Sequence, residues 1–98
     1  MEVVFADADL DRLEVDPRFT AGHGGPVVRA YRRVMQAIRA AVDERDLYAL
    51  KGLRLEKLKG DRRQQHSLRL NGQWRLIVEF EGEGASKKVR VVEIVDYH

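Results

Sequence analysis

The chain has 98 residues, enough for one small hydrophobic core and too few for a second domain. Its 44% hydrophobic and 35% charged residues are typical of a globular protein, and the absence of cysteine excludes disulfide scaffolds, thiolate metal sites and cysteine nucleophiles. No apolar run approaches the roughly 20 residues of a membrane helix, and no signal-peptide pattern opens the chain. We therefore expect one domain over residues 1–98, in the cytoplasm and without membrane contact.

The net charge of +2 conceals an uneven distribution along the chain. Residues 1–16 carry six acidic side chains and one arginine, whereas residues 51–75 carry eight lysines or arginines and two acidic side chains. A basic segment of this density indicates an anionic partner, with nucleic acid as the first candidate. A solvated surface without any partner is an equally consistent interpretation of the charge alone.

The first half of the chain predicts one strand and two helices. Residues 1–5 alternate weakly, as a short strand does, and Asp7 can cap a short acidic helix with Leu10 and Leu13 on one face. A glycine-rich loop follows over residues 17–26.

The second helix is the most regular element of the sequence. Pro26 suits its first position, and we expect it to end at residues 43–46, with a further short turn over residues 47–50. Its apolar stripe is predicted to form the core; the members are Val27, Tyr31, Val34, Met35, Ile38 and Val42.

The second half of the chain predicts three strands joined by tight turns. A basic connection anchored by Leu55 and Leu58 precedes them and stops at residues 60–61. Asn71-Gly72 is a strong hairpin signal because both residues tolerate the positive φ that two-residue turns demand. Alternation predicts strands over residues 66–70, 74–80 and 89–95, with a glycine-containing turn over residues 81–86.

This order predicts an α+β fold in which two N-terminal helices pack on one face of a small antiparallel sheet. The other face of the sheet is expected to be open. Trp74, Leu76 and Val78 share one side of their strand, so Arg75 is expected to lie on the open face.

No pattern of a metal, cofactor or serine-nucleophile site is present. The glycine-rich loop lacks the strand and the Lys-Ser/Thr ending of a phosphate loop, and the sequence holds no G-x-S-x-G motif. His23, His66 and His98 do not have metal-ligand spacing. We therefore expect neither a metal ion nor a cofactor.

The remaining polar groups suit the cleavage of RNA by its own 2′-hydroxyl. That reaction needs a base for the hydroxyl, an acid for the leaving 5′ oxygen and cations for the phosphoryl oxygens. Arg75 and Lys59 can supply the cations, and His98 can exchange a proton near neutral pH. Asp96 can orient a ring, and Tyr97 can stack on a base or relay a proton.

Simpler interpretations of the same residues stay open. The Asp-Tyr-His sequence is also typical of a frayed strand end, and Arg75 could pair with Glu79 or Glu93 across the sheet. The arginines of the second helix could be a solvated face, and Trp74 is more typical of a core residue than of a stacking platform.

The second half of the chain resembles the HigB branch of the RelE/ParE toxin superfamily. The resemblance rests on L-E-K-L-K-G-D-R at residues 55–62, S-L-R-L-N-G-Q-W-R-L at residues 67–76 and D-Y-H at residues 96–98. It covers residues 50–98 well and the first half only in the order of its elements. The three stretches in this order form a specific signal, whereas each alone is weak.

The resemblance implies a bacterial type II toxin with a compact, RelE-like and microbial-ribonuclease-like fold. It also implies ribosome-dependent cleavage of messenger RNA in the decoding site and neutralisation by a helix-turn-helix antitoxin of the HigA kind. Lys59 and Arg75 would then hold the scissile phosphate. Asp96, Tyr97 and His98 would complete the catalytic cluster, with His98 as the leading proton-transfer group.

One position departs from the family pattern. Several members have a histidine where this chain has Glu56, so the division of acid and base roles between Glu56 and His98 stays open. The acidic first helix is also unlike the basic start expected of a ribosome binder, and it could face the antitoxin. Further basic side chains are candidates for contact with RNA: Lys57, Arg62, Arg63, Arg69, Arg29, Arg32 and Arg33.

Two other functions fit the sequence. One is a non-enzymatic toxin on the same fold, similar to the ParE toxins that poison DNA gyrase. The other is a basic nucleic-acid-binding module without activity. A pure blocker would not need the polar cluster of Lys59, Arg75, Tyr97 and His98, and this cluster favours the ribonuclease.

Overall fold

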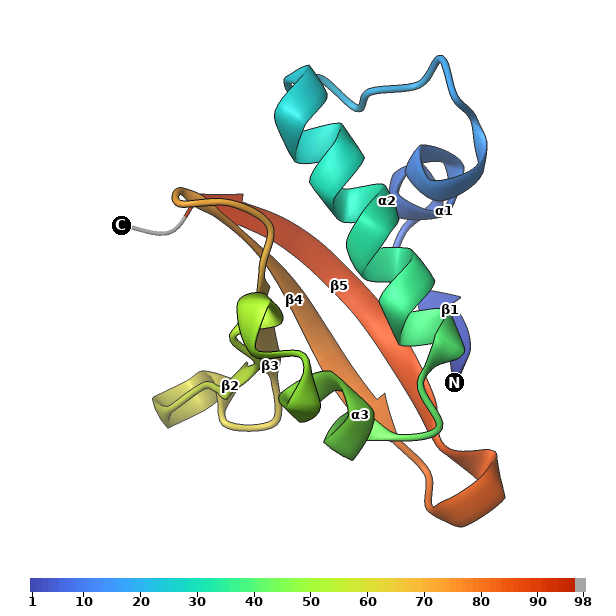
Figure 1. Ribbon diagram of the computed structural model, residues 1–98, viewed down its shortest axis with the longest axis vertical. Helices are drawn as coiled ribbons and strands as arrows, with labels where there is room; N and C mark the ends of the chain where they lie inside the picture. Colours follow the sequence, from blue (N-terminus) through green and yellow to red (C-terminus); the bar gives the residue numbers. More distant parts are fainter. Residues whose placement is uncertain (97–98) are drawn as a thin grey trace.

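The computed structural model describes residues 1–96 as a five-stranded sheet with two helices packed on one face (Figure 1). The strand order is β1-β5-β4-β3-β2, and the pairing is antiparallel except between β1 and β5. The strands are β1 (Glu2–Phe5), β2 (Glu56–Lys57), β3 (His66–Arg69), β4 (Trp74–Glu81) and β5 (Lys88–Asp96). The predicted α+β class, with its two N-terminal helices on one face, is confirmed.

Three α-helices and three 3₁₀ turns complete the structure. The helices are α1 (Ala8–Val15), α2 (Gly25–Ala40) and α3 (Glu44–Ala49), and the 3₁₀ turns are η1 (Lys51–Leu53), η2 (Gly60–Arg62) and η3 (Gly84–Ser86). None of the helices in the described part of the chain is long and apolar enough to cross a membrane.

The core lies between the sheet and the pair α1 and α2. Leu13, Tyr31 and Ile38 from the helices are fully buried against Leu76 and Val78 of β4. The predicted apolar stripe of α2 is confirmed except at its last member. Val42 exposes 76% of its surface because α2 ends at Ala40.

The segment after α2 differs from the prediction. Asp43 does not end α2 but begins α3, because its carboxylate accepts a hydrogen bond from the Arg45 N–H at 2.9 Å. Leu47, expected in a short turn, is the fully buried anchor of this helix. The basic connection also contains β2, which pairs with β3 and extends the sheet by one strand. Helices of six residues and strands of two residues are too short to show a period.

The hairpin between β3 and β4 is where the sequence predicts it, but its turn is of another kind. Neither Asn71 nor Gly72 has a positive φ. The Asn71 side chain instead accepts hydrogen bonds from the backbone N–H groups of Gln73 and Trp74, both at 2.9 Å. The Leu70 N–H donates to the Trp74 carbonyl, so the loop holds three residues and not two.

A β-bulge in β5 changes which side chains face the core. Ile77 of β4 lies opposite Glu93, but Val78 lies opposite Val91, so Val92 is an extra residue. Val91 is fully buried in the core, whereas Val95, beyond the bulge, lies opposite Arg75 on the other face. Unbroken alternation would place Val91 and Val95 on the same face.

Replacing Tyr31 with phenylalanine tests the contact between α1 and α2. The buried Tyr31 hydroxyl donates to the Leu10 carbonyl at 2.7 Å, and burial raises the pKa of this phenol well above its usual value, so it stays a donor. Tyr31→Phe should lower the free energy of unfolding by about 1–2 kcal/mol, measured by urea denaturation, because a buried carbonyl loses its partner. Tyr48→Phe is the matched control at an exposed position and should change stability by less than about 0.5 kcal/mol.

Acid should weaken the fold through His66. Burial, and secondarily the nearby Lys57, lower the pKa of this imidazole, whose ring packs edge-on against Phe80. The unfolded chain therefore takes up the proton more readily, and stability should fall as the pH drops below about 6.5. His66→Gln should flatten the dependence of the unfolding free energy on pH between 7 and 5. An unchanged slope in this variant would contradict the assignment, and His23→Gln is the control.

Candidate functional site

Arg75 occupies a buried position on the sheet face that lies away from α1 and α2. Its side chain exposes about a tenth of its surface, and its Nη2 donates to the Ser67 hydroxyl at 2.8 Å and to the Arg54 carbonyl at 3.0 Å. Ser67 is itself buried on the neighbouring strand β3. Arg54 has a left-handed backbone (φ 45°), which directs its carbonyl to the guanidinium after η1. Ser67 of β3 and the Arg54 carbonyl after η1 thus fix the orientation of the Arg75 guanidinium.

The sheet face around Arg75 is not open as the sequence predicted. Ser67, Arg75 and Ile77 are all buried there. The connection over residues 51–63 covers them in part, held by Leu55, which is buried, and by Leu58, which is half-buried. The predicted face of Arg75 is confirmed, but a covering segment makes it a pocket and not a flat surface.

The pocket beside Arg75 has a volume of about 250 Å³. Lys59 and Arg62 add two cations to its wall, and Ile77 and Val95 form an apolar floor. The lining comes from β3, β4, β5 and the covering connection; it comprises Leu58, Lys59, Arg62, Ser67, Arg75, Ile77 and Val95. Three cations around a partly enclosed volume favour an anionic ligand, because charge interactions strengthen where water is excluded.

Two arginines that lie opposite each other in the sheet also favour an anionic ligand. Arg69 lies directly opposite Arg75 in the register of β3 and β4, and like charges in this position repel each other. Glu56 is a nearby carboxylate, with an oxygen 3.7 Å from the Arg75 Nη2, but more than half of its side chain is exposed. Because this ion pair is long and solvated, Glu56 offsets little of the repulsion between Arg69 and Arg75.

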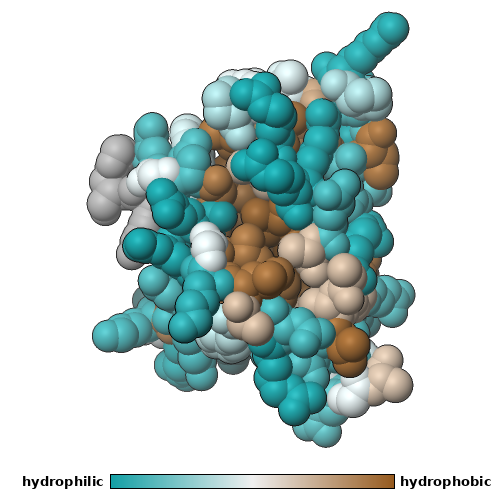
Figure 2. Space-filling view, in the orientation of Figure 1, coloured by the Kyte–Doolittle hydropathy of each residue, from teal (hydrophilic) through white to brown (hydrophobic). Residues whose placement is uncertain are grey.

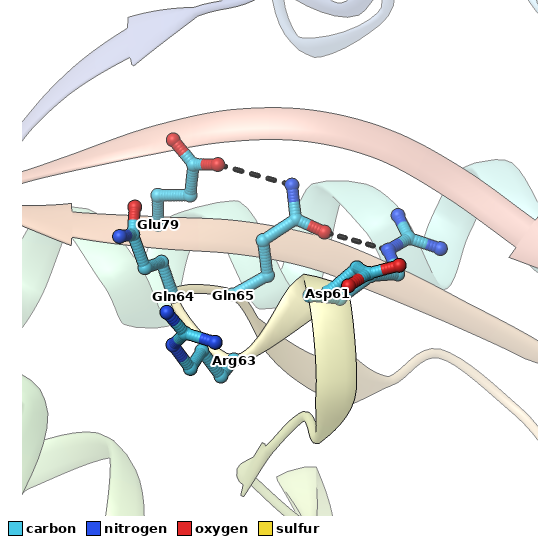
Figure 3. Close-up of a pocket in the computed structure, with 6 residues that line it drawn as sticks. Asp61, Arg63, Gln64, Gln65 and Glu79 are labelled. Carbon is cyan, nitrogen blue, oxygen red and sulfur yellow. Dashed lines mark hydrogen bonds between the residues drawn. The ribbon is translucent and has the colours of Figure 1, made fainter.

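A second hollow lies beside the first, around η2 and the start of β3 (Figure 3). The Arg62 Nε donates to the Gln65 side chain at 2.7 Å, and Gln65 donates in turn to Glu79 at 3.0 Å. Arg62 also forms an ion pair with Glu93 at 3.4 Å. These contacts attach η2 to β4 and β5, and Arg62 therefore stabilises the covering segment. Arg63 is exposed at the same hollow.

The end of β5 lies beside Trp74 and Arg75. Asp96 is opposite Trp74, and its carboxylate accepts a hydrogen bond from the Gln73 amide at 3.0 Å. Trp74 is half-buried, packs partly against the core and meets His23 edge-on at 5.4 Å between ring centroids. Tyr97 and His98, which the sequence places in the catalytic cluster, lie outside the described residues.

The predicted RNA-contacting residues do not form one group. Arg32 donates to the carbonyls of Leu13, Asp16 and Phe19, which makes it an anchor of the loop after α1. Arg29 and Arg33 are exposed on α2, across the sheet from Arg75. Lys57 is exposed on β2 next to Glu56. Lys59, Arg62, Arg69 and Arg75 are the members that the structure places on one face.

Sequence reasoning missed Ser67 and the Arg54 carbonyl. A two-residue turn at Asn71-Gly72 would pair Leu68 with Arg75, whereas the observed loop places Ser67 opposite Ile77 and beside Arg75. The one available signal was the pattern of leucines, since Leu68 and Leu76 both face the core in the observed register but not in the register of a two-residue turn. No group of three or more potential metal ligands gathers within residues 1–96.

The fold of this chain also occurs in a solved toxin structure. Among solved structures, the chain is similar to a YoeB/ParE toxin from Agrobacterium tumefaciens, with a TM-score of 0.63 and 19% sequence identity over the whole of both chains. At that identity the likeness concerns the fold. A search of curated proteins gave no match.

The family itself follows from the sequence of nearly the whole chain. Residues 4–98 match the family model described as the RelE-like toxin of the type II toxin-antitoxin system HigB, and the chain belongs to this family of HigB-like toxins. The predicted resemblance is confirmed, and it extends over the first half as well. As a type II toxin, the protein has an antitoxin as its partner.

Replacing Ser67 tests how the guanidinium of Arg75 is held. Ser67→Ala should lower the free energy of unfolding by about 1.5–3 kcal/mol, because a buried cation loses a hydrogen-bond acceptor. Urea denaturation measures this loss. Ser86→Ala removes an exposed hydroxyl in η3 and should cost less than half as much. Equal losses at the two serines would contradict the role assigned to Ser67.

Proposed function

We propose that this toxin is a ribosome-dependent endoribonuclease that cleaves messenger RNA without a metal ion. In this reaction the 2′-hydroxyl attacks the adjacent phosphate and the bond to the 5′ oxygen breaks, which leaves a 2′,3′-cyclic phosphate and a 5′-hydroxyl. The observation that carries the proposal is the pocket beside Arg75, where three cations surround a small, partly enclosed volume. Membership of the HigB-like toxins supports it, as does the cationic face.

Arg75 and Lys59 would stabilise the phosphoryl oxygens as negative charge accumulates on them. Arg75 is suited to this because its orientation is fixed before the ligand arrives by Ser67 and Arg54, so little reorganisation accompanies the reaction. Lys59 is exposed at the pocket wall and can follow the phosphate as a mobile point charge.

The proton-transfer groups would come from the end of the chain. Asp96 closes β5 beside Arg75, and Tyr97 and His98 follow it directly in sequence. We propose His98 as the leading acid and base, with Asp96 and Tyr97 as orienting and stacking groups. Glu56, whose carboxylate lies 3.7 Å from Arg75, is the second candidate for the base.

The other proposed contacts concern the ribosome and the antitoxin. Arg62, in the covering connection, and Arg69, opposite Arg75 on β3, would bind RNA at the pocket face. The exposed Lys57 and Arg63 would add contacts with RNA outside the pocket. Arg29 and Arg33 would reach RNA from another side. Arg32 is retained only as a packing residue because three carbonyls bind it. The antitoxin would be a HigA-like helix-turn-helix protein, and both proteins would act in the cytoplasm.

Primer extension on a translated message tests the proposal. Lys59→Ala, Arg75→Ala and deletion of His98 should each reduce cleavage at least a hundredfold, because each removes charge stabilisation or proton transfer. Arg18→Ala, at an exposed position in the loop before α2, is the matched control and should cleave like the wild type. Circular dichroism should show all four variants folded.

Two results would contradict the ribonuclease. Full cleavage by folded Arg75→Ala and by the chain without His98 would remove the catalytic assignment. Intact message together with DNA damage on induction would instead favour a ParE-like gyrase inhibitor on the same fold. Glu56→Gln separates the two candidate bases: a loss as large as that without His98 assigns the base to Glu56.

A further inference from the structure

The hollow around η2 lies next to the pocket beside Arg75, and Arg62 lines both cavities. Its volume of about 390 Å³ is larger than the 250 Å³ of the pocket and lies within the range of small-molecule sites. We call this feature the η2 hollow. Its lining within residues 1–96 is entirely polar and comprises Asp61, Arg62, Arg63, Gln64, Gln65 and Glu79.

The polar lining distinguishes the η2 hollow from the cavities beside α2 and η1. Those cavities are lined mainly by alanine and leucine, and Figure 2 shows hydrophobic side chains gathered in the middle of the face beside α2. The η2 hollow lies on the other side of the sheet, because Glu79 alternates along β4 with the buried Val78 of the core. A hollow with this lining offers hydrogen bonds and not hydrophobic burial, so it suits a polar ligand.

The charges of the two neighbouring cavities select different groups. Three cations line the pocket beside Arg75, whereas in the η2 hollow two carboxylates, those of Asp61 and Glu79, offset the charges of the two arginines. A phosphate favours the pocket because carboxylates repel it. The η2 hollow suits an uncharged polar group instead. In RNA, the uncharged group with a planar hydrogen-bonding edge is the base, which amide and carboxylate side chains recognise.

The Gln65 carboxamide is held in one orientation at the η2 hollow (Figure 3). Its oxygen accepts a hydrogen bond from the Arg62 Nε at 2.7 Å, and its nitrogen donates to a Glu79 carboxylate oxygen at 3.0 Å. The reverse orientation is excluded because a guanidinium only donates and a carboxylate only accepts. Arg62 is itself held by its ion pair with Glu93 at 3.4 Å. The donor of Gln65 is therefore fixed before a ligand arrives, which reduces the entropy cost of binding.

Two groups of this network are left for a ligand. The Gln65 nitrogen has a second N–H and Glu79 has a second carboxylate oxygen, and neither has a hydrogen-bond partner within residues 1–96. A base with an amino group beside a ring nitrogen, such as cytosine or adenine, donates to the carboxylate and accepts from the amide. The one ring N–H of uracil lies between two carbonyl oxygens, which a carboxylate repels.

We propose that the η2 hollow is a nucleobase subsite beside the phosphate pocket, in which Gln65 and Glu79 favour a base with an amino group over uracil. Arg63 is exposed at the hollow, where its guanidinium can stack on the base. The inference rests on the proposed ribonuclease function, because it takes the phosphate of an RNA strand to lie in the pocket beside Arg75.

Isothermal titration calorimetry with the full chain tests the proposal by comparing oligocytidylate with oligouridylate, both 2′-O-methylated. The methyl group blocks the attacking hydroxyl, so neither oligonucleotide is cleaved. The two bases share one ring and differ only in the amino or carbonyl group and the adjacent ring nitrogen. The wild type should bind oligocytidylate at least about fivefold more tightly. Glu79→Gln should reduce this preference to less than about twofold, because an amide can donate to a uracil carbonyl.

Two further variants separate the hollow from general charge effects. Glu81→Gln is the matched control, because it removes the same charge from the same strand but does not line the hollow, and it should keep the preference. Gln65→Leu should lose the preference as Glu79→Gln does, because the fixed donor is gone. Thermal unfolding midpoints within a few degrees of the wild type show that the variants are folded.

Mapped cleavage ends on a translated message show the same selection during the reaction. Uracil should be depleted at one fixed position beside the cleaved bond in the wild type, and Glu79→Gln should remove this depletion. The base most frequent at that position then distinguishes cytosine from adenine as the preferred ligand. Equal use of the four bases by the wild type would overturn the proposal.

The binding results distinguish failure of the subsite from failure of the ribonuclease. Equal affinities of the wild type for the two oligonucleotides would overturn the subsite. So would a preference that survives in both Glu79→Gln and Gln65→Leu, or one that Glu81→Gln loses equally, because the base would then be selected outside the hollow. A wild type that prefers oligocytidylate but does not cleave message would refute the ribonuclease and leave the subsite intact.

Discussion

The buried guanidinium of Arg75 is the interaction on which the rest of the site depends. A charge removed from water costs several kcal/mol unless hydrogen-bond acceptors replace the lost solvent. Ser67 and the Arg54 carbonyl supply acceptors, and each requires a specific piece of the fold. Ser67 requires the register between β3 and β4, and Arg54 requires the left-handed residue after η1. The covering connection is therefore part of the cationic site and not a simple linker.

The helices and strands that are long enough to show a periodic hydrophobic pattern were predictable from the sequence, and the short ones were not. The stripe that contains Tyr31 and Ile38 identifies α2, and alternation around Leu76 and Val78 identifies β4. α3 and β2 leave no period to detect. Both nevertheless have local causes, because the Asp43 carboxylate caps α3 and Leu55 buries the chain just before β2. Their existence depends on the core and the sheet that they pack against.

The turn preference of Asn71-Gly72 predicted the position of the hairpin correctly. The same preference would have given the wrong register between β3 and β4. Asn71-Gly72 favours a two-residue turn, but the Asn71 carboxamide binds two backbone N–H groups and a three-residue loop results. A shift of one residue moves every side chain of a strand to the other face. Leu68 of β3 and Leu76 of β4 share the core in the observed register but not in one shifted by a single residue, so burial overrides the preference of the turn. The bulge at Val92 then sets the face of Val95 in the same way.

The basic residues illustrate what the sequence could not resolve about the site. Their density predicted an anionic partner, but a pattern along the chain does not separate Lys59, which lines the pocket, from Arg32, which three carbonyls hold. The covering connection also links the cationic site to the core. Leu53 of η1 packs against the core, and the next residue, Arg54, supplies the carbonyl that accepts a hydrogen bond from Arg75. The packing of one residue therefore positions the backbone group that orients the guanidinium, and no periodic pattern in the sequence reveals that contact.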